Sequence, residues 1–533
     1  MQVQRLALPM LAGLVLAASA LSGAAQAQGA AEPVRPTSQW QTSQWQTWQW
    51  QTWQWQTSTP EEQGMDSAAL ARLVNFGTDH GLDSLLIARH GRIVLDAYYA
   101  PYTPEIPHLF NSVTKAVTGT LVAMLLRDGV LDSLDHRMVD FFGDRAIANL
   151  DDRKRAITVQ TMLDMTSGMA WTEGVEGGRP DSLIEWGRSP DAIQFILDRP
   201  MAKAPGEAFY YNTGNAQLLA AIINKLTGMS ARDYAVTKLF RPLGIAAPYW
   251  HSIGPGLTQG GGGLQLAPRD AARIGLLYLH DGEWDGQRLL PTGWVDRIRH
   301  ATTDMHASFD PSLRYANFFW VMPQRQAVMA VGDRCQLVML FPALDIVTVV
   351  TARDYCSFGR MADEISGAVK SDTALPVNSV GGNQLASALR DIATEKPSAV
   401  GAVPETAAAI SGKTWRFPAN GFNLRALTLH LTDQPAHYEL ETATPDPAKP
   451  VTTLAGPIGL DGAYRLGQPT ALGVMALKGT WQDNQTFAID LRLVGGDTDR
   501  RWLLSFDGGK ARLSGKDRFG RDVKADAEAP GAQ

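Results

Sequence analysis

Cysteine, clustered charge and long apolar segments are all scarce in this chain. Its 533 residues include two cysteines, and 48 basic and 54 acidic side chains leave a net charge of −6. Because no run of lysine and arginine could follow a phosphate backbone or coat an anionic membrane, we expect neither nucleic acid nor stable membrane insertion. An HExxH motif, a Cys/His cluster and a GxSxG elbow are also missing, so the sequence predicts no metal, no cofactor and no α/β-hydrolase.

The N-terminus carries the one long apolar run. Arg5 precedes the apolar residues 6–21, and Ala25-Gln26-Ala27 fits the small-x-small pattern that a signal peptidase cleaves. Residues 1–27 are therefore predicted to be a cleavable signal peptide of a periplasmic or secreted protein. The alternative, a membrane anchor, is disfavoured because the run is short and rich in alanine and glycine, and no cysteine for lipidation follows it.

A five-residue repeat follows, reading WQTSQ-WQTWQ-WQTWQ-WQTS over residues 40–58. It carries no charge and has no apolar partner outside itself, so we expect residues 28–59 to form a disordered linker. Stacking of its tryptophans on carbohydrate is the alternative interpretation.

The remaining chain divides into two globular parts. Residues 60–372 place helical spacing between strand patterns at both ends, which predicts one antiparallel sheet assembled from both ends of the domain. Residues 373–410 form a connector rich in Ala, Pro, Ser and Gly, with one short helix near 384–394. Residues 411–527 alternate at period two between turns, which predicts an antiparallel all-β domain, either a small barrel or a sandwich.

Ser112 and Lys115 are the first candidate catalytic pair. They form the only S-x-x-K of the chain, at the start of a predicted helix that ends near Gly129. A spacing of three places both side chains on one helical face, and the helix N-terminus favours an oxyanion there. The apolar neighbours predict a desolvated lysine with a lowered pKa, able to act as a base. In the alternative interpretation Ser112 is only an N-cap and Lys115 reaches the surface.

A tyrosine and an asparagine form the second candidate motif, in "PGEAFYYNTGN". Tyr210 stands two residues before Asn212, in a turn that leads into an apolar helix. A nearby lysine is expected to lower the pKa of the Tyr210 phenol toward a value useful for proton transfer. Tyr211 is assigned to packing.

These motifs together resemble the serine β-lactamase and penicillin-binding-protein superfamily. The resemblance rests on S-V-T-K, on Y-x-N after P-G-x-x-F, on "GGGGLQLAPRDAARIGLLYL" at 260–279 and on "LFPALDIVTVV", and is strongest to class C β-lactamase-related proteins such as family VIII carboxylesterases. It implies an α/β sandwich, an antiparallel sheet flanked by helices, with Ser112 as the acylated nucleophile.

The third motif departs from this family. Where lactamases of the group have K-T-G, the chain has Ala330-Val331-Gly332, so the cation that would hold a substrate carboxylate is missing. Gly332 still permits close approach of a substrate, and the N–H of Asp333 is expected to join that of Ser112 in an oxyanion hole. Arg334 is an alternative partner for a carboxylate if its side chain turns inward.

The two cysteines, Cys335 and Cys356, flank a predicted β-hairpin. The hairpin would bring them near each other, and an exported chain would meet an oxidising compartment. A disulfide is one expectation, and two unpaired thiols are the other.

We therefore predict an exported serine hydrolase in which Ser112 is acylated and Lys115 and Tyr210 move protons. The substrate is expected to be a small ester, amide or peptide, and Ala330 favours a carboxylesterase or amidase. The alternatives are a β-lactamase, a peptidase acting on D-amino-acid or cell-wall peptides, and a non-catalytic envelope protein that resembles penicillin-binding proteins.

Overall fold

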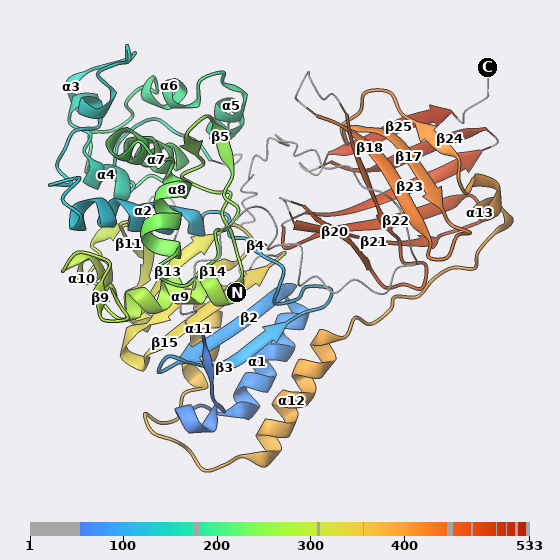
Figure 1. Ribbon diagram of the computed structural model, residues 1–533, viewed down its shortest axis with the longest axis horizontal. Coiled ribbons are helices and arrows are strands. Elements are labelled where there is room, and N and C mark those ends of the chain that lie inside the picture. Colours follow the sequence, from blue (N-terminus) through green and yellow to red (C-terminus); the bar gives the residue numbers. More distant parts are fainter. Residues whose placement is uncertain are drawn as a thin grey trace. The chain divides into compact units, whose positions relative to one another are not determined.

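The computed structural model of the chain forms two compact units (Figure 1). The first unit takes in the described parts of Trp48–Tyr98 and Pro107–Asp391, and the second those of Tyr99–Ile106 and Ile392–Gln533. The predicted signal peptide 1–27 and most of the linker 28–59 lie outside the described residues. The structure describes residues 54–173, 181–305, 310–354, 356–444, 451–470, 473–496, 498–507, 509–517 and 521–528.

A nine-stranded sheet forms the centre of the first unit, in the order β1-β3-β2-β15-β14-β13-β12-β11-β10. All neighbouring strands are antiparallel except β1 and β3. Strands from both ends of the domain meet where β2 pairs with β15, as the sequence predicted. The strands are β1 Gln56–Thr57, β2 Leu82–Arg89, β3 Arg92–Tyr98, β10 Thr303–Asp304, β11 Arg314–Ala316, β12 Phe319–Met322, β13 Ala327–Gly332, β14 Gln336–Phe341 and β15 Ile346–Ala352.

The end of the tryptophan repeat is part of this sheet. We expected disorder up to residue 59, but Gln56 and Thr57 form β1 and pair with β3. The indole N–H of Trp55 also donates to the Arg269 carbonyl at 3.0 Å. The end of the repeat is therefore ordered by contacts with other parts of the domain, namely the backbone of β3 and the carbonyl of Arg269.

Helices pack on the sheet and complete the predicted sandwich. Helix α9 (Pro268–Leu279) lies against β14 and β15, where Gly275 leaves room for Val338, Leu340 and Val347. Helix α1 (Ser67–Asp79) contacts β2 and α11 (Phe358–Gly367). Apart from α2 and α7, the other helices are α3 Asp152–Arg155, α4 Val159–Leu163, α5 Ser182–Arg188, α6 Ala192–Leu197, α8 Ala231–Ala235, α10 Trp294–Arg299 and α12 Ser379–Ala393.

Two of the helices are central. Helix α2 (Val113–Arg127) is buried from Val113 to Leu125, and α7 (Thr213–Thr227) is buried from Thr213 to Ile223. They contact each other, and α2 also contacts β13. Because α2 is buried on all sides over these residues, it is held within the domain, and its N-terminus is fixed in place.

The second unit contains one ten-stranded antiparallel sheet and helix α13 (Glu405–Ile410). Its first strand, β16, pairs with its last, β25, and aromatic side chains such as Trp415, Phe487 and Phe506 fill one shared core. Gly and Pro interrupt the alternating pattern in some of the strands, such as β19 and β20. The strands are β16 Thr414–Arg416, β17 Leu424–His430, β18 His437–Ala443, β19 Val451–Pro457, β20 Arg465–Thr470, β21 Gly473–Trp481, β22 Thr486–Val494, β23 Asp499–Asp507, β24 Lys510–Lys516 and β25 Asp522–Glu528.

No helix among the described residues has the length and apolar character needed to cross a membrane.

Candidate active site

Ser112 and Lys115 lie together at the N-terminus of α2. Ser112 is the residue immediately before the helix, and the Lys115 amine donates a hydrogen bond to Ser112 Oγ at 2.8 Å. The serine side chain makes no capping bond to the helix backbone. The pair therefore has the contact that transfer of the serine proton to the amine requires.

Lys115 is buried, with 2% of its surface exposed. Its amine makes a second hydrogen bond, to the Gly261 carbonyl at 3.0 Å. Burial lowers the pKa of Lys115 to about 8, because desolvation disfavours the ammonium form, while the charge of Glu173 acts in the opposite direction. A neutral amine is accordingly available near neutral pH.

The glycine run at 260–263 allows the chain to pass close to this lysine. A Cβ on Gly261 would lie 2.6 Å from Thr213 Cγ2 and 3.4 Å from Lys115 Nζ. A Cβ on Gly260 would lie 2.2 Å from the Ala216 carbonyl oxygen. These residues are glycines because the segment is confined between α2 and α7.

Tyr211, rather than Tyr210, is the tyrosine beside the pair. The Lys115 amine lies 4.8 Å from the centre of the Tyr211 ring, which is buried, with 5% of the residue's surface exposed. Tyr210 is 36% exposed, and neighbouring side chains of an extended segment point in opposite directions. Our assignment of Tyr210 is therefore displaced by one residue.

The protonation of Tyr211 also differs from the expectation. Burial and the charge of Glu173 raise the pKa of the Tyr211 phenol, and a hydrogen bond with Ser112 opposes the rise only in part. We expected a nearby lysine to lower the pKa of Tyr210 and assigned Tyr211 to packing. Since desolvation disfavours the phenolate, Tyr211 is a phenol at neutral pH and is suited to donate or relay a proton.

Asn212 is buried at the start of α7. Its Oδ1 is the nearest atom, at 2.8 Å, to a Cβ built on Gly214, and its amide has no hydrogen-bond partner among the described residues. The methyl group of Thr213 faces Gly261, next to Lys115. Tyr211 thus lies where Tyr210 was predicted, while Asn212 packs against Gly214.

Glu173 is a site residue that the sequence analysis missed. Its Oε1 accepts hydrogen bonds from the backbone N–H of Thr213 and from the indole of Trp171, the latter at 2.8 Å. Burial raises the pKa of its carboxyl group, and the charge of Lys115 lowers it. Glu173 therefore holds the first turn of α7 and sets the electrostatic environment of Lys115. It lies in a loop outside the quoted motifs, so no spacing signal could have found it.

The turn after β13 approaches the nucleophile from the sheet. A Cβ on Gly332 would lie 2.4 Å from the Phe110 carbonyl oxygen and 3.2 Å from the Ser112 nitrogen, so only glycine fits. The Asp333 carbonyl accepts from the Asn111 side chain at 3.2 Å. These contacts bring Gly332 and Asp333 beside Ser112, where the sequence analysis expected them.

A disulfide joins Cys335 to Cys356, with their Cα atoms 5.5 Å apart. Cys335 follows Arg334 in the β13–β14 turn, and both residues have left-handed backbone conformations, with φ of 60° and 55°. The disulfide ties this turn to the segment after β15. It restrains the part of the chain that carries Gly332 and Asp333.

Residues 70–355 match the model of the Beta-lactamase family, and this segment contains Ser112, Lys115, Glu173, Tyr211 and Gly332. The chain belongs to the beta-lactamase family. As the motifs indicated, it is placed among the serine hydrolases of the β-lactamase and penicillin-binding-protein superfamily.

Named relatives of this beta-lactamase-family chain include hydrolases and penicillin-binding proteins. The 6-aminohexanoate-dimer hydrolase of Paenarthrobacter ureafaciens is 26% identical over 285 residues, which cover 50% of this chain and 71% of that protein. Penicillin-binding protein 4 of Amycolatopsis lactamdurans is 31% identical over 185 residues, covering 34% and 44% of the two chains. The solved structure of a family VIII carboxylesterase is 14% identical, with a TM-score of 0.43, and covers 64% of this chain and 99% of its own.

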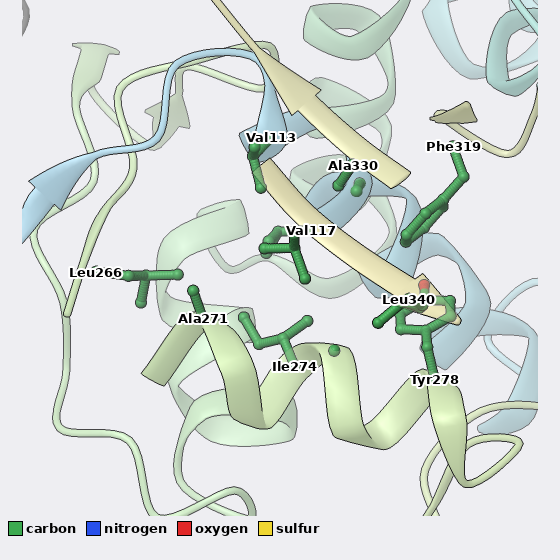
Figure 2. A pocket seen from close by; sticks show the side chains of 12 residues that line it. Val113, Val117, Leu266, Ala271, Ile274, Tyr278, Phe319, Ala330 and Leu340 are labelled. Carbon is green, nitrogen blue, oxygen red and sulfur yellow. The ribbon is translucent and has the colours of Figure 1, made fainter. Parts of the chain in front are cut away.

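The third-motif position of this family member lies in an apolar environment. Ala330 lines a small cavity of about 20 Å³ beneath α2, which Figure 2 shows between α2, α9 and the sheet. Val113, Val117 and Ile274 are among its other walls, and all twelve lining residues have apolar or aromatic side chains or none. An ammonium group at position 330 would lose its hydration here, so the alanine suits its surroundings.

Proposed function

We propose that this chain is an exported serine hydrolase that cleaves esters or amides through an acyl-enzyme on Ser112. The observation that carries the proposal is the 2.8 Å contact between the buried Lys115 amine and Ser112 Oγ at the start of a helix. A solvated lysine would be almost fully protonated at neutral pH, whereas burial brings the pKa of Lys115 to about 8. This pair is arranged as a nucleophile and its base.

Acylation begins when neutral Lys115 takes the hydroxyl proton of Ser112. Ser112 Oγ forms a bond to the substrate carbonyl carbon, and the carbonyl electrons move to oxygen. The N–H groups of Ser112 and Asp333 are the proposed donors to this oxyanion. When the intermediate collapses, the bond to the leaving group breaks, and the proton held by Lys115 passes through the Tyr211 hydroxyl to the departing alkoxide or amine.

Deacylation uses the same groups in reverse. Lys115 and Tyr211 accept a proton from water, whose oxygen attacks the acyl carbon. The acid product leaves and the proton returns to Ser112 Oγ. Glu173 does not touch the substrate in this scheme. It accepts a hydrogen bond from the first turn of α7, and its negative charge raises the pKa of Lys115.

The lack of a cation at position 330 favours substrates without a carboxylate. A charge-assisted contact is worth about 1.5–3 kcal/mol, or roughly ten- to a hundredfold in kcat/KM. β-Lactam and carboxypeptidase substrates carry a carboxylate that would lack this contact here, whereas neutral esters have no carboxylate to bind. Arg334 is half-buried in the β13–β14 turn and is our candidate to replace it.

A substrate panel tests this function. We expect p-nitrophenyl butyrate to be cleaved with a kcat/KM about ten- to a hundredfold above that of nitrocefin, because only nitrocefin needs the missing cation. The linear 6-aminohexanoate dimer and a D-aminoacyl p-nitroanilide test amides. Ser112→Ala should abolish every activity in the panel.

Two results would contradict the proposal. Equal or faster cleavage of nitrocefin would favour a β-lactamase, and loss of that activity in Arg334→Ala alone would identify the substitute cation. A wild-type protein that cleaves nothing in the panel would favour the non-catalytic alternative.

The pH dependence of ester hydrolysis reports the Lys115–Glu173 pair. Because the neutral amine is the base, kcat/KM should rise with pH and level off above about 8. Glu173→Gln removes a negative charge that favours the ammonium form, so the pKa of Lys115 falls and the rising limb should move to lower pH. Glu207→Gln, at an exposed ion pair with Lys203, is the control and should leave the limb in place. If the pH at which kcat/KM rises is unchanged or higher in Glu173→Gln, then the charge of Glu173 does not raise the pKa of Lys115.

A further inference from the structure

Two histidines stack face to face in the second unit. His430 ends β17 and His437 begins β18, and the two are direct cross-strand partners in the hairpin. Their ring centres lie 4.1 Å apart with an angle of 8° between the planes. Only ten histidines occur in the chain, so a stacked pair in register calls for a physical explanation.

A carboxylate completes this cluster. Glu439 lies two residues after His437, so strand alternation puts it on the same face of the sheet. One ligand atom from each of the three residues can be chosen so that all lie within 4.8 Å of one another. Ligand atoms bound at about 2.0–2.2 Å in a tetrahedral zinc site are roughly 3.4 Å apart. Because the lone pair of an imidazole lies in its ring plane, binding of one ion requires the two rings to turn out of their parallel stack until both planes contain the ion.

The hairpin loop orients both rings. Asp433 Oδ2 lies 3.7 Å from His430 Nδ1 and 3.8 Å from His437 Nδ1, and the Pro435 carbonyl lies 3.3 Å from His437 Nδ1. Acceptors near Nδ1 favour the tautomer in which Nδ1 carries the hydrogen. In that tautomer the lone pair of Nε2 is available to bind a metal ion. A carboxylate behind a ligating imidazole is the usual second layer of a metal site.

We propose that His430, His437 and Glu439 bind one divalent transition-metal ion of the Zn²⁺ type. Imidazole and carboxylate donors suit zinc, whereas Mg²⁺ and Ca²⁺ prefer an all-oxygen set. The ion would lie on the face opposite to Leu429 and Tyr438, which belong to the core of this unit. It would fasten β17 to β18 at their shared turn.

This site escaped the sequence analysis, which expected no metal. Its ligands are spread over a hairpin with spacings of seven and two residues, which match no linear zinc motif. The pairing of the two strands, and not the spacing, brings the imidazoles together. The site belongs to the second unit, whereas Ser112 belongs to the first.

Isothermal titration calorimetry of the full-length, tag-free chain with ZnCl₂ tests the proposal, after chelator treatment and dialysis. We expect one ion per chain. His430→Asn and His437→Asn should each weaken binding by at least about a hundredfold, and Asp433→Asn by about tenfold, as is usual for a group behind a ligand. MgCl₂ should give no binding.

His300→Asn is the matched control, because His300 also lies beside a carboxylate, Asp296, and belongs to no metal-type cluster within the described part of the chain. It should bind zinc as the wild type does, and so should Ser112→Ala. Far-ultraviolet circular dichroism checks that each variant is folded. Absence of stoichiometric binding in the wild type, or equal binding by folded His430→Asn and His437→Asn, would overturn the proposal.

Discussion

Replacing Lys115 by methionine is expected to lower kcat for p-nitrophenyl butyrate on the order of a hundredfold or more, because the variant has no group to accept the Ser112 proton. Methionine keeps most of the buried chain volume, so the fold should survive. Steady-state kinetics with a circular dichroism check measures the effect.

Lys154 supplies the control for that experiment. It is a second fully buried lysine, and its amine donates to the carbonyls of Ala148 and Leu197 at 2.7 and 2.8 Å. Lys154→Met should lose stability but keep its kcat, measured on folded protein. A similar loss of kcat in both variants would mean that burial of an amine, rather than its contact with Ser112, matters.

Tyr211→Phe should be the second severe loss, with kcat falling about a hundredfold, because the hydroxyl that relays protons is removed while the ring packing stays. Tyr210→Phe changes the same group one residue earlier, on a side chain that is 36% exposed, and should keep most of the activity. Steady-state kinetics of the two variants under one set of conditions decides between the assignments. If Tyr210→Phe were the inactive variant, the placement of Tyr211 would be wrong.

The Ser112–Lys115 pair was predictable because its geometry is local. Within one helix, a spacing of three fixes the relative direction of two side chains, and apolar neighbours predict burial. The identity of the tyrosine was not predictable in this way. Tyr210 and Tyr211 precede a helix in an irregular segment, and which ring faces Lys115 depends on how that segment meets α2.

Contacts between distant segments account for the other residues that the sequence did not reveal. Glu173 reaches Thr213 and Trp171 from a loop with no periodic pattern. The strands of the first unit are predictable from sequence, since the strand patterns at about 317–322, 327–332, 336–341 and 346–352 coincide closely with β12 to β15. In the second unit β19 and β20 contain glycine and proline, and only pairing with neighbours defines them.

The central claim is that Ser112 forms a covalent acyl-enzyme, and labelling tests it most directly. Wild-type protein treated with a fluorophosphonate should gain the mass of one adduct, and peptide mapping should place that adduct on Ser112. Ser112→Ala should gain none, and Lys115→Met should react much more slowly. An adduct on any other serine, or no adduct on the folded wild-type protein, would contradict the account.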